Sequence, residues 1–245
     1  MGAEVGRALV DVGYDVGWLA KGRGPGTRRR AADARLRELD DLRGCELVLS
    51  ICPPAAAVET ARNVGGFTGL YVDANAISPA TAGEVAAVVH HLGIEYIDGG
   101  IIGPPPKSDG TTRLYLSGGR AQEVAAVFER SRVESIVLPG CDTAASALKM
   151  TYAAWTKISA ALLVSIAGTA DHLGVADALA LEWERSQPGL HARQAAALQS
   201  ARAKGWRWAD EMREIACTFA AAGQPDGFGD GAAEQFSRWA RPPDD

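Results

Sequence analysis

The spacing of apolar residues divides this 245-residue chain into two halves. Up to about residue 141, short apolar runs rich in β-branched residues alternate with segments of helical spacing, and beyond residue 143 only helical spacing remains. Strands that alternate with helices predict βαβ crossovers and a doubly wound, mostly parallel sheet. We therefore predict an α/β fold with two domains, a Rossmann-like domain over residues 1–141 and an all-α domain over residues 142–245.

The same pattern predicts the individual elements. A stretch rich in glycine and proline, residues 99–112, is expected to be loop only. In the first half we expect helices at residues 1–12, 55–64, 78–92 and 121–131, one further helix that ends near residue 43, and strands at residues 15–20, 46–52, 70–73, 94–98, 113–117 and 135–138. In the second half we expect helices at residues 175–187, 190–203, 206–222 and 230–240.

Residues 143–173 form the longest uninterrupted helical pattern in the chain. This stretch has no proline and a single glycine, Gly168, so it predicts one helix of about thirty residues. A helix of that length between the two halves is most simply the element that joins them. Because a half this small cannot cover a long apolar helix alone, we expect a homodimer through this helix and the C-terminal domain.

The beginning of the chain lacks an expected element. A doubly wound sheet normally starts with a strand that leads into a glycine-rich turn, whereas here a helix follows Met1 and Gly2 directly. Either the sheet lacks its central strand or the sequence is missing residues at its start. We favour the second interpretation, because loss of a central strand leaves two buried ladders unpaired.

Composition and charge narrow the range of functions. A net charge of −5 gives no electrostatic argument for binding nucleic acid or an anionic membrane. The four cysteines and four histidines show no metal-binding spacing, and free thiols indicate a reducing compartment. No run of 18 apolar residues is present, and Glu4 and Arg7 do not fit a signal peptide. We therefore expect a cytoplasmic protein without a metal centre.

Several motifs resemble those of one enzyme superfamily. The stretch GAEVGRAL, which begins at Gly2, is similar to the end of a G-x-G-x-x-G fingerprint and its first helix. SICPP at 50–54 is similar to an apolar strand that closes on a proline pair, and DANAISP at 73–79 to a D-x-S-T-I-S-P stretch. DGGIIGP at 98–104 stands where that superfamily has its substrate loop. Together they resemble the β-hydroxyacid dehydrogenases, which include 3-hydroxyisobutyrate and 6-phosphogluconate dehydrogenases and the imine reductases.

Lys149 lies where this superfamily carries its catalytic lysine. The resemblance implies an oxidoreductase that moves a hydride between nicotinamide and a substrate carbon, with Lys149 as proton donor or acceptor. Its neighbours Leu148 and Met150 are apolar, so the lysine must reach along the surface to solvent or line a cleft. A solvated surface charge is the ordinary role of a helix lysine, and we assign that role, at a surface or interface, to Lys157.

The resemblance also implies a set of cofactor-binding residues. The loop after the second expected strand offers basic side chains and no carboxylate before Asp33, which suits the 2′-phosphate of NADP better than the ribose of NAD. Cys52 has no base close in sequence, so it is not expected to be a reactive thiolate. The expected cofactor-binding residues are Gly2, Lys21, Gly22, Arg23, Thr27, Cys52, Pro53, Pro54 and Asn75.

The expected substrate-binding residues are Ile102, Gly103, Pro104 and Tyr152. Ile102 replaces the serine that holds a carboxylate in the superfamily, and Asp210-Glu211 stands in place of a Lys-Asp pair. These departures argue against an ordinary small 3-hydroxyacid and favour a poorly characterised bacterial subgroup with a phosphogluconate-dehydrogenase-like C-terminal domain. We expect a hydroxyacid-like or sugar-acid-like substrate. An imine substrate and a non-catalytic, truncated chain with impaired cofactor binding remain the alternatives.

Overall fold

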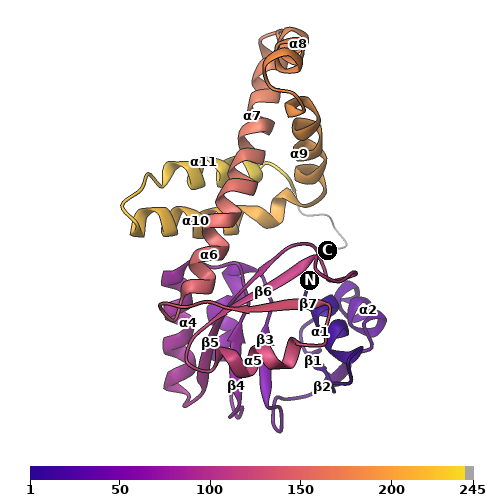
Figure 1. Ribbon diagram of the computed structural model, residues 1–245, viewed down its shortest axis with the longest axis vertical. Helices are drawn as coiled ribbons and strands as arrows, with labels where there is room; N and C mark the ends of the chain where they lie inside the picture. Colours follow the sequence, from indigo (N-terminus) through magenta and orange to yellow (C-terminus); the bar gives the residue numbers. More distant parts are fainter. Residues whose placement is uncertain (241–245) are drawn as a thin grey trace. The chain divides into compact units, whose positions relative to one another are not determined.

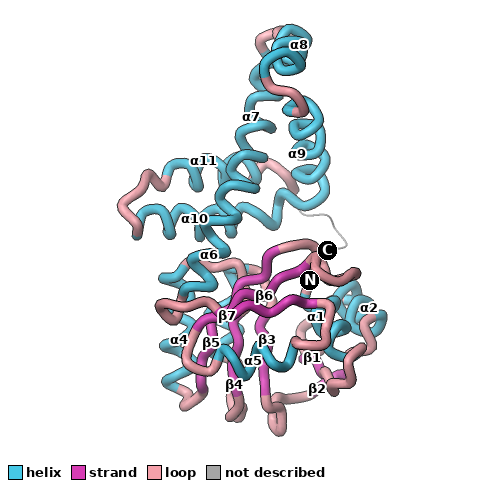
Figure 2. Tube along the Cα trace, in the orientation of Figure 1, coloured by secondary structure: helices cyan, strands magenta, loops and turns pink. Residues whose placement is uncertain are grey.

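The protein is described by a computed structural model that covers residues 1–240. These residues form two compact units, one from Met1 to Lys149 and one that begins at Met150. All strands lie in the first unit, and the second is helical (Figures 1 and 2). The predicted fold class, an α/β sheet followed by an all-α region, is therefore confirmed.

The first unit alternates strands and helices in the predicted manner. Its helices are α1 (Gly2–Val10), α2 (Pro25–Asp33), α3 (Ala57–Arg62), α4 (Pro79–His91) and α5 (Ala121–Phe128), with a short 3₁₀ turn, η1, at Pro54–Ala56. Its strands are β1 (Gly17–Leu19), β2 (Arg37–Leu39), β3 (Leu47–Ser50), β4 (Leu70–Asp73), β5 (Glu95–Ile102), β6 (Thr112–Ser117) and β7 (Val133–Val137).

The strands form two separate sheets. The larger sheet has the order β3-β4-β5-β6-β7, and only the β5–β6 pair is antiparallel. Strands β1 and β2 pair with each other in parallel and form the smaller sheet, beside α1 and α2 in Figure 1. The parallel ends of β3, β4 and β5 meet at one edge, where α/β proteins place their ligands.

Helices pack on both faces of the larger sheet, as a doubly wound fold requires. On one face, Val5 and Leu9 of α1 and Phe128 of α5 share a core with the sheet. On the other face, Val85 and Val89 of α4 pack with strand residues. Strand β4 is buried along its whole length, which explains its uninterrupted apolar sequence before Asp73.

Two predictions for the first unit are wrong. The helix expected to end near residue 43 ends at Asp33, because Arg35 adopts a positive φ of 60° and the chain turns into β2. Strand β2 has a largely exposed Arg-Glu-Leu sequence and so carries no apolar signal. Residues 99–102 are strand rather than loop, because both glycines of β5 pair with β6.

In the second unit, α11 begins at Gly227, three residues before the expected start of the last helix at residue 230.

The predicted long helix is confirmed as a continuous helix of 29 residues, Ala144–His172. It consists of α6 (Ala144–Ala153), a π-helical turn (Ala154–Ile158) and α7 (Ser159–His172), and the boundary between the units falls within α6. By length and composition alone this helix could cross a membrane, which is weak evidence because core helices of soluble proteins share these properties. The remaining helices are α8 (Ala176–Ser186), α9 (Leu190–Lys204), η3 (Gly205–Arg207), α10 (Trp208–Ala221) and α11 (Gly227–Phe236).

Two glycines of α11 allow a test of how closely this helix packs on α10. A Cβ at Gly229 would lie 2.7 Å from the backbone nitrogen of Ala216 and 2.8 Å from the carbonyl oxygen of Met212. We expect Gly229→Ala to lower the free energy of unfolding by about 1 to 3 kcal/mol, because the two helices must separate. A Cβ at Gly231 meets nothing within 4 Å. Gly231→Ala should raise the same quantity by up to about 1 kcal/mol through helix propensity.

Urea unfolding of both variants, followed by tryptophan fluorescence, measures the difference. Five of the six tryptophans lie in the second unit, so this signal reports mainly on it. Equal effects of the two substitutions would contradict the close packing of α11 on α10.

Candidate active site

The residues expected to bind a cofactor gather at the carboxyl end of β3. Gly2, the first residue of α1, lies against this end, since a Cβ there would be 3.6 Å from Cβ of Ile51. The backbone N–H of Cys52 donates to Oδ1 of Asn75 at 2.6 Å, and Nδ2 of Asn75 donates to Oγ of Ser50 at 3.1 Å. The amide side chain of Asn75 thus ties the ends of β3 and β4 together beside the N-terminus of α1.

The basic loop after β1 approaches the same place. Gly22 has a φ of 75°, which favours glycine, and the N–H of Arg23 donates to the carbonyl of Ala20 at 3.1 Å. Arg23 lies near enough to Cys52 for its positive charge to act on the thiol. Gly2, Cys52 and Asn75 therefore belong to one cluster, and the charge of Arg23 acts on Cys52 from the turn after β1. Lys21 is exposed in this turn, and Thr27 lies in the first turn of α2, where its hydroxyl accepts from Arg30.

The proline pair follows the cluster directly. Pro53 is extended, with φ −60° and ψ 146°, and Pro54 begins η1. Burial raises the pKa of the Cys52 thiol, and Thr60 donates to its sulfur at 3.6 Å. The thiol is therefore neutral at physiological pH, in agreement with the expectation that Cys52 is not a reactive thiolate.

Helix α6 holds Lys149 on strand β5. A Cβ at Gly100 would lie 3.1 Å from Cβ of Lys149 and 2.7 Å from the carbonyl oxygen of Ala145, so the first turns of α6 rest directly on the strand. Lys149 itself is half-buried. Because alternate residues of a strand share a face, Ile102 lies on the same face of β5 as Gly100. The structure thus places Lys149 of α6 against the face of β5 that carries Ile102, one of the expected substrate residues.

The rest of the expected substrate loop follows β5. Ile102 is buried, while Gly103 and Pro104 are exposed. Gly103 has a φ of 119°, and the carbonyl of Pro104 accepts from Oγ1 of Thr112 at 2.5 Å, so the loop is fixed to β6. Tyr152 is 45% exposed on α6 and belongs to the second unit.

Lys157 has a different environment from the one we expected. It forms an ion pair with Glu211 of α10, in which the side chains are only 18% and 8% exposed, and its ammonium lies 5.6 Å from the centre of the Trp208 ring. Lys157 is therefore not the solvated surface lysine of our first expectation, and its role at an interface stays a prediction. Its position in the π-helical turn, opposite an acidic residue 54 positions later, could not be recognised from local sequence.

Two buried aspartates were not identified from the sequence. Asp73 and Asp98 are directly opposite each other in β4 and β5 and are 1% and 0% exposed. Burial raises the pKa of Asp73 to about 7, against the hydrogen bond from the N–H of Asn75 and with the help of the negative charge of Asp98. Burial also raises the pKa of Asp98. Asp73 ends the apolar run of β4, whereas Asp98 lies in the middle of β5, so only Asp73 carries a sequence signal of a strand end.

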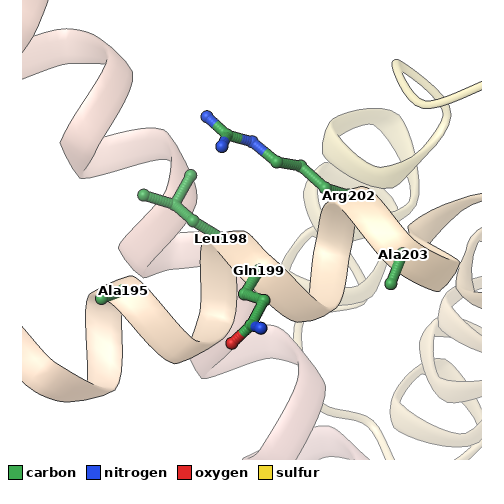
Figure 3. Close-up of a pocket in the computed structure, with 5 residues that line it drawn as sticks. All are labelled: Ala195, Leu198, Gln199, Arg202 and Ala203. Carbon is green, nitrogen blue, oxygen red and sulfur yellow. The ribbon is translucent and has the colours of Figure 1, made fainter.

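Surface hollows in the second unit lie apart from these residues. One is lined by five residues of α9, which Figure 3 shows on a single helix, with Leu198 and Arg202 projecting from it. Another follows α7 and α8 and is lined by apolar side chains such as Leu162 and Leu173. Neither hollow includes a residue expected to bind cofactor or substrate.

Comparisons with known sequences match the C-terminal part of the chain to a domain family and about two thirds of it to a relative. Residues 170–239 match a domain family described as a domain of unknown function, DUF1932. An uncharacterized 28.5 kDa protein of Methanothermus fervidus, encoded in a 7S RNA 5′ region, is 27% identical over 170 residues. That alignment covers 67% of this chain and 65% of the relative, so it spans just under two thirds of the relative's length.

Solved structures match nearly the whole chain. The conserved protein MTH1747, of unknown function and described as similar to 3-hydroxyacid dehydrogenases, is 25% identical, with a TM-score of 0.70 over 96% of this chain and 92% of that one. A Mycobacterium tuberculosis 3-hydroxyisobutyrate dehydrogenase with L-serine is 18% identical, with a TM-score of 0.67 over 97% and 89%. Psf3 in complex with NADP+ and 2-OPP is 18% identical, with a TM-score of 0.64 over 97% and 90%. The resemblance inferred from the sequence motifs is confirmed at the level of the fold.

The raised pKa of Asp73 predicts a pH-dependent stability. A carboxyl group whose pKa is higher in the folded state stabilises the fold fully below its unfolded pKa, and this contribution is lost as the pH rises towards the folded value. We expect the free energy of unfolding to fall between pH 5 and pH 8 by about 2 kcal/mol more in the parent protein than in Asp73→Asn. The asparagine retains an acceptor for the N–H of Asn75.

Urea unfolding followed by far-ultraviolet circular dichroism at both pH values measures this difference. Asp109→Asn, at an exposed aspartate, is the matched control and should behave like the parent protein. If Asp73→Asn retains the full pH dependence, Asp73 does not titrate in this range.

Proposed function

Because the chain has the fold of the β-hydroxyacid dehydrogenase-like superfamily, we propose that it is an NADP-dependent oxidoreductase acting on a small hydroxyacid-like or sugar-acid-like substrate. The observation that carries the proposal is the position of Lys149, whose Cβ lies against Gly100 on the face of β5 that leads to Ile102. A lysine held at the carboxyl edge of an α/β sheet is well placed for proton transfer to a bound ligand.

The clustered residues at the end of β3 fit a dinucleotide. Gly2 at the start of α1 offers backbone N–H groups without a side chain, which suits a phosphate group. The end of β3 offers the backbone of Cys52 and Pro53, and Asn75 orders this segment from β4. When bound, the nicotinamide supplies the site that accepts or donates the hydride.

The basic loop favours NADP over NAD. Arg23 lies beside this cluster, and Lys21 is exposed in the same turn. A guanidinium and an ammonium there can bind a 2′-phosphate, which NAD does not have. The NADP+ complex of Psf3, a protein of the same fold, is consistent with this preference.

Lys149 acts in this proposal as a general acid or base. Its amino group donates a proton to a developing alkoxide in reduction, or removes the hydroxyl proton in oxidation. The buried Ile102 contributes an apolar wall where the superfamily offers a serine, which favours a substrate that needs no carboxylate contact at that position. The same observation supports an imine as the second candidate substrate, with Lys149 as the proton source.

Lysine substitutions test the proposed function. We expect Lys149→Met and Lys149→Arg to lower kcat/KM by about 10² to 10⁴ with NADPH affinity unchanged, because neither side chain exchanges a proton at neutral pH. NADPH fluorescence titration gives the affinity, and turnover is measured with panels of hydroxyacids, sugar acids and cyclic imines. NADPH should bind more tightly than NADH.

The matched control is Lys204→Met, which removes an exposed ammonium at the end of α9 and should leave turnover unchanged. Absence of NADPH binding would contradict the cofactor assignment and favour a non-catalytic protein. Full turnover in Lys149→Met would remove the acid or base role of this lysine.

We also propose that the chain forms a homodimer through its long helix and C-terminal part. The supporting observation is a row of exposed large apolar residues on α7 and in the segment through α8, including Leu162 at 58% and Leu173 at 65% exposure. Burial of such a surface is favourable, and symmetric pairing is its simplest form. Light scattering should give about twice the 25.7 kDa chain mass, and the double variant Leu162→Glu, Leu173→Glu should approach one chain mass. A monomeric parent protein at micromolar concentration would contradict the proposal.

A further inference from the structure

The N-terminus of α6 is held by residues from the sheet. The first N–H groups of any helix have no partner within the helix and need one elsewhere. In α6, Ala145 and Ser146 of the first turn are fully buried, so water does not satisfy them. The sequence at residues 143–146 gives no indication of where their hydrogen-bond partners lie.

Asp98 supplies these partners from the middle of β5. Its Oδ2 accepts from the N–H of Ser146 at 2.8 Å and its Oδ1 accepts from the hydroxyl of Ser146 at 2.5 Å. The hydroxyl of Ser117 in β6 donates to Oδ2 of Asp98 at 3.0 Å and accepts from the N–H of Ala145 at 3.0 Å. One buried carboxylate therefore fixes the first turn of α6 to two neighbouring strands.

Gly100 determines how closely the next turn of α6 approaches β5. It follows Asp98 by two residues and lies on the same face of β5. Because Gly100 has no side chain, the carbonyl of Ala145 and the Cβ of Lys149 can rest against the strand, within 2.7 Å and 3.1 Å of where a Cβ would be. Asp98, which anchors α6, and Gly100, which leaves room for α6, are thus neighbouring positions on this face of β5.

We propose that Asp98 is the positioning residue for Lys149: it holds the first turn of α6 on β5 so that the amino group of Lys149 stands at a fixed height above the carboxyl edge of the sheet. This inference deepens the proposed function and rests on it. Asp98 acts through Ser146 and Ser117 and has no contact with the reacting groups in the proposal. A carboxylate is suited to this role because it accepts several hydrogen bonds and its charge complements the positive end of the helix.

Asp98→Asn tests the proposal with a nearly isosteric change. The amide carries no charge, and its N–H₂ group replaces one of the two acceptor oxygens, so it accepts fewer of the three hydrogen bonds from Ser146 and Ser117 and the anchor is weakened. We expect kcat to fall by about 10- to 100-fold with NADPH affinity unchanged, because a small displacement of a catalytic group is costly. Ser146→Ala removes the hydroxyl donor alone and should produce a smaller effect in the same direction, which keeps the test decisive if Asp98→Asn does not fold.

A second readout needs neither cofactor nor substrate. Trace acetylation with acetic anhydride, followed by mass spectrometry, gives the reactivity of Lys149 relative to the exposed Lys107 in the same sample. We expect this ratio to rise by about threefold or more in Asp98→Asn, since local opening of α6 exposes the half-buried lysine. This ratio reports on the local position of Lys149. A change in global stability alone leaves the ratio unchanged.

Ser78→Ala is the matched control. Ser78 is buried, caps α4 in the same unit and accepts from the N–H of Thr81 at 3.2 Å, so its loss removes a helix cap of the same kind elsewhere. It should lower the urea midpoint without changing kcat or the acetylation ratio of Lys149.

The outcomes separate the two proposals. An unchanged acetylation ratio in folded Asp98→Asn, or an equal change in Ser78→Ala, overturns the positioning role. If Lys149→Met retains full turnover, the proposed function fails, while the acetylation ratio still decides whether Asp98 fixes the lysine. A raised ratio and a lowered kcat in Asp98→Asn, with neither in Ser78→Ala, support the inference.

Discussion

The carboxylate of Asp98 is the interaction on which the functional edge of the first unit depends. It joins β5, β6 and the start of α6 through Ser146 and Ser117, at a place that is fully buried. Buried N–H groups without acceptors would destabilise the fold by about 1 to 3 kcal/mol each, so this partner stabilises the start of the helix. The start of α6 in turn determines where Lys149 lies.

This arrangement places two carboxyl groups opposite each other in a region without solvent. Asp73 and Asp98 are in register on β4 and β5, and ionisation of both is opposed by burial and by their mutual repulsion. Their hydrogen-bond partners differ. Asp98 accepts from Ser146 and Ser117 at a helix N-terminus, whereas Asp73 accepts from the N–H of Asn75. We infer that the negative charge resides on Asp98 and that Asp73 carries a proton near neutrality. The pair therefore anchors α6 while burying a single negative charge.

The sequence was informative wherever an element has a periodic apolar face. Strand β4 is as predicted because it is buried along its whole length, and the helix of 29 residues is as predicted because helical spacing continues through it without a proline. Strand β2 and the end of β5 were missed for opposite reasons. The first is an exposed, polar edge strand, and the second contains two glycines that local propensity assigns to a loop. Both are defined by the strands they pair with, which local sequence does not reveal.

Prediction of the candidate site from the sequence was limited in the same way. Lys149 and the residues near Cys52 were recognised through motifs, and the structure brings several of them together at the end of β3. Asp98 begins the DGGIIGP motif, but its role depends on Ser146, 48 residues later in the chain. The ion pair of Lys157 with Glu211 spans 54 residues and was missed in the same way. Partners that far apart leave no spacing to recognise in a single sequence.

The order of residues on one face of β5 explains how this strand can contribute both to the hydrophobic core and to the candidate site. Its residues change character step by step towards the carboxyl end: Tyr96 packs in the core, Asp98 anchors the helix, Gly100 gives the helix room and Ile102 leads into the exposed loop. Each step has a different physical requirement, namely burial, charge, small size and an apolar side chain. A larger residue at Gly100 would move α6 away even with Asp98 intact, and loss of the Asp98 carboxylate would weaken the attachment of α6 even with Gly100 intact. The position of Lys149 is therefore determined by both residues together, and neither is sufficient alone.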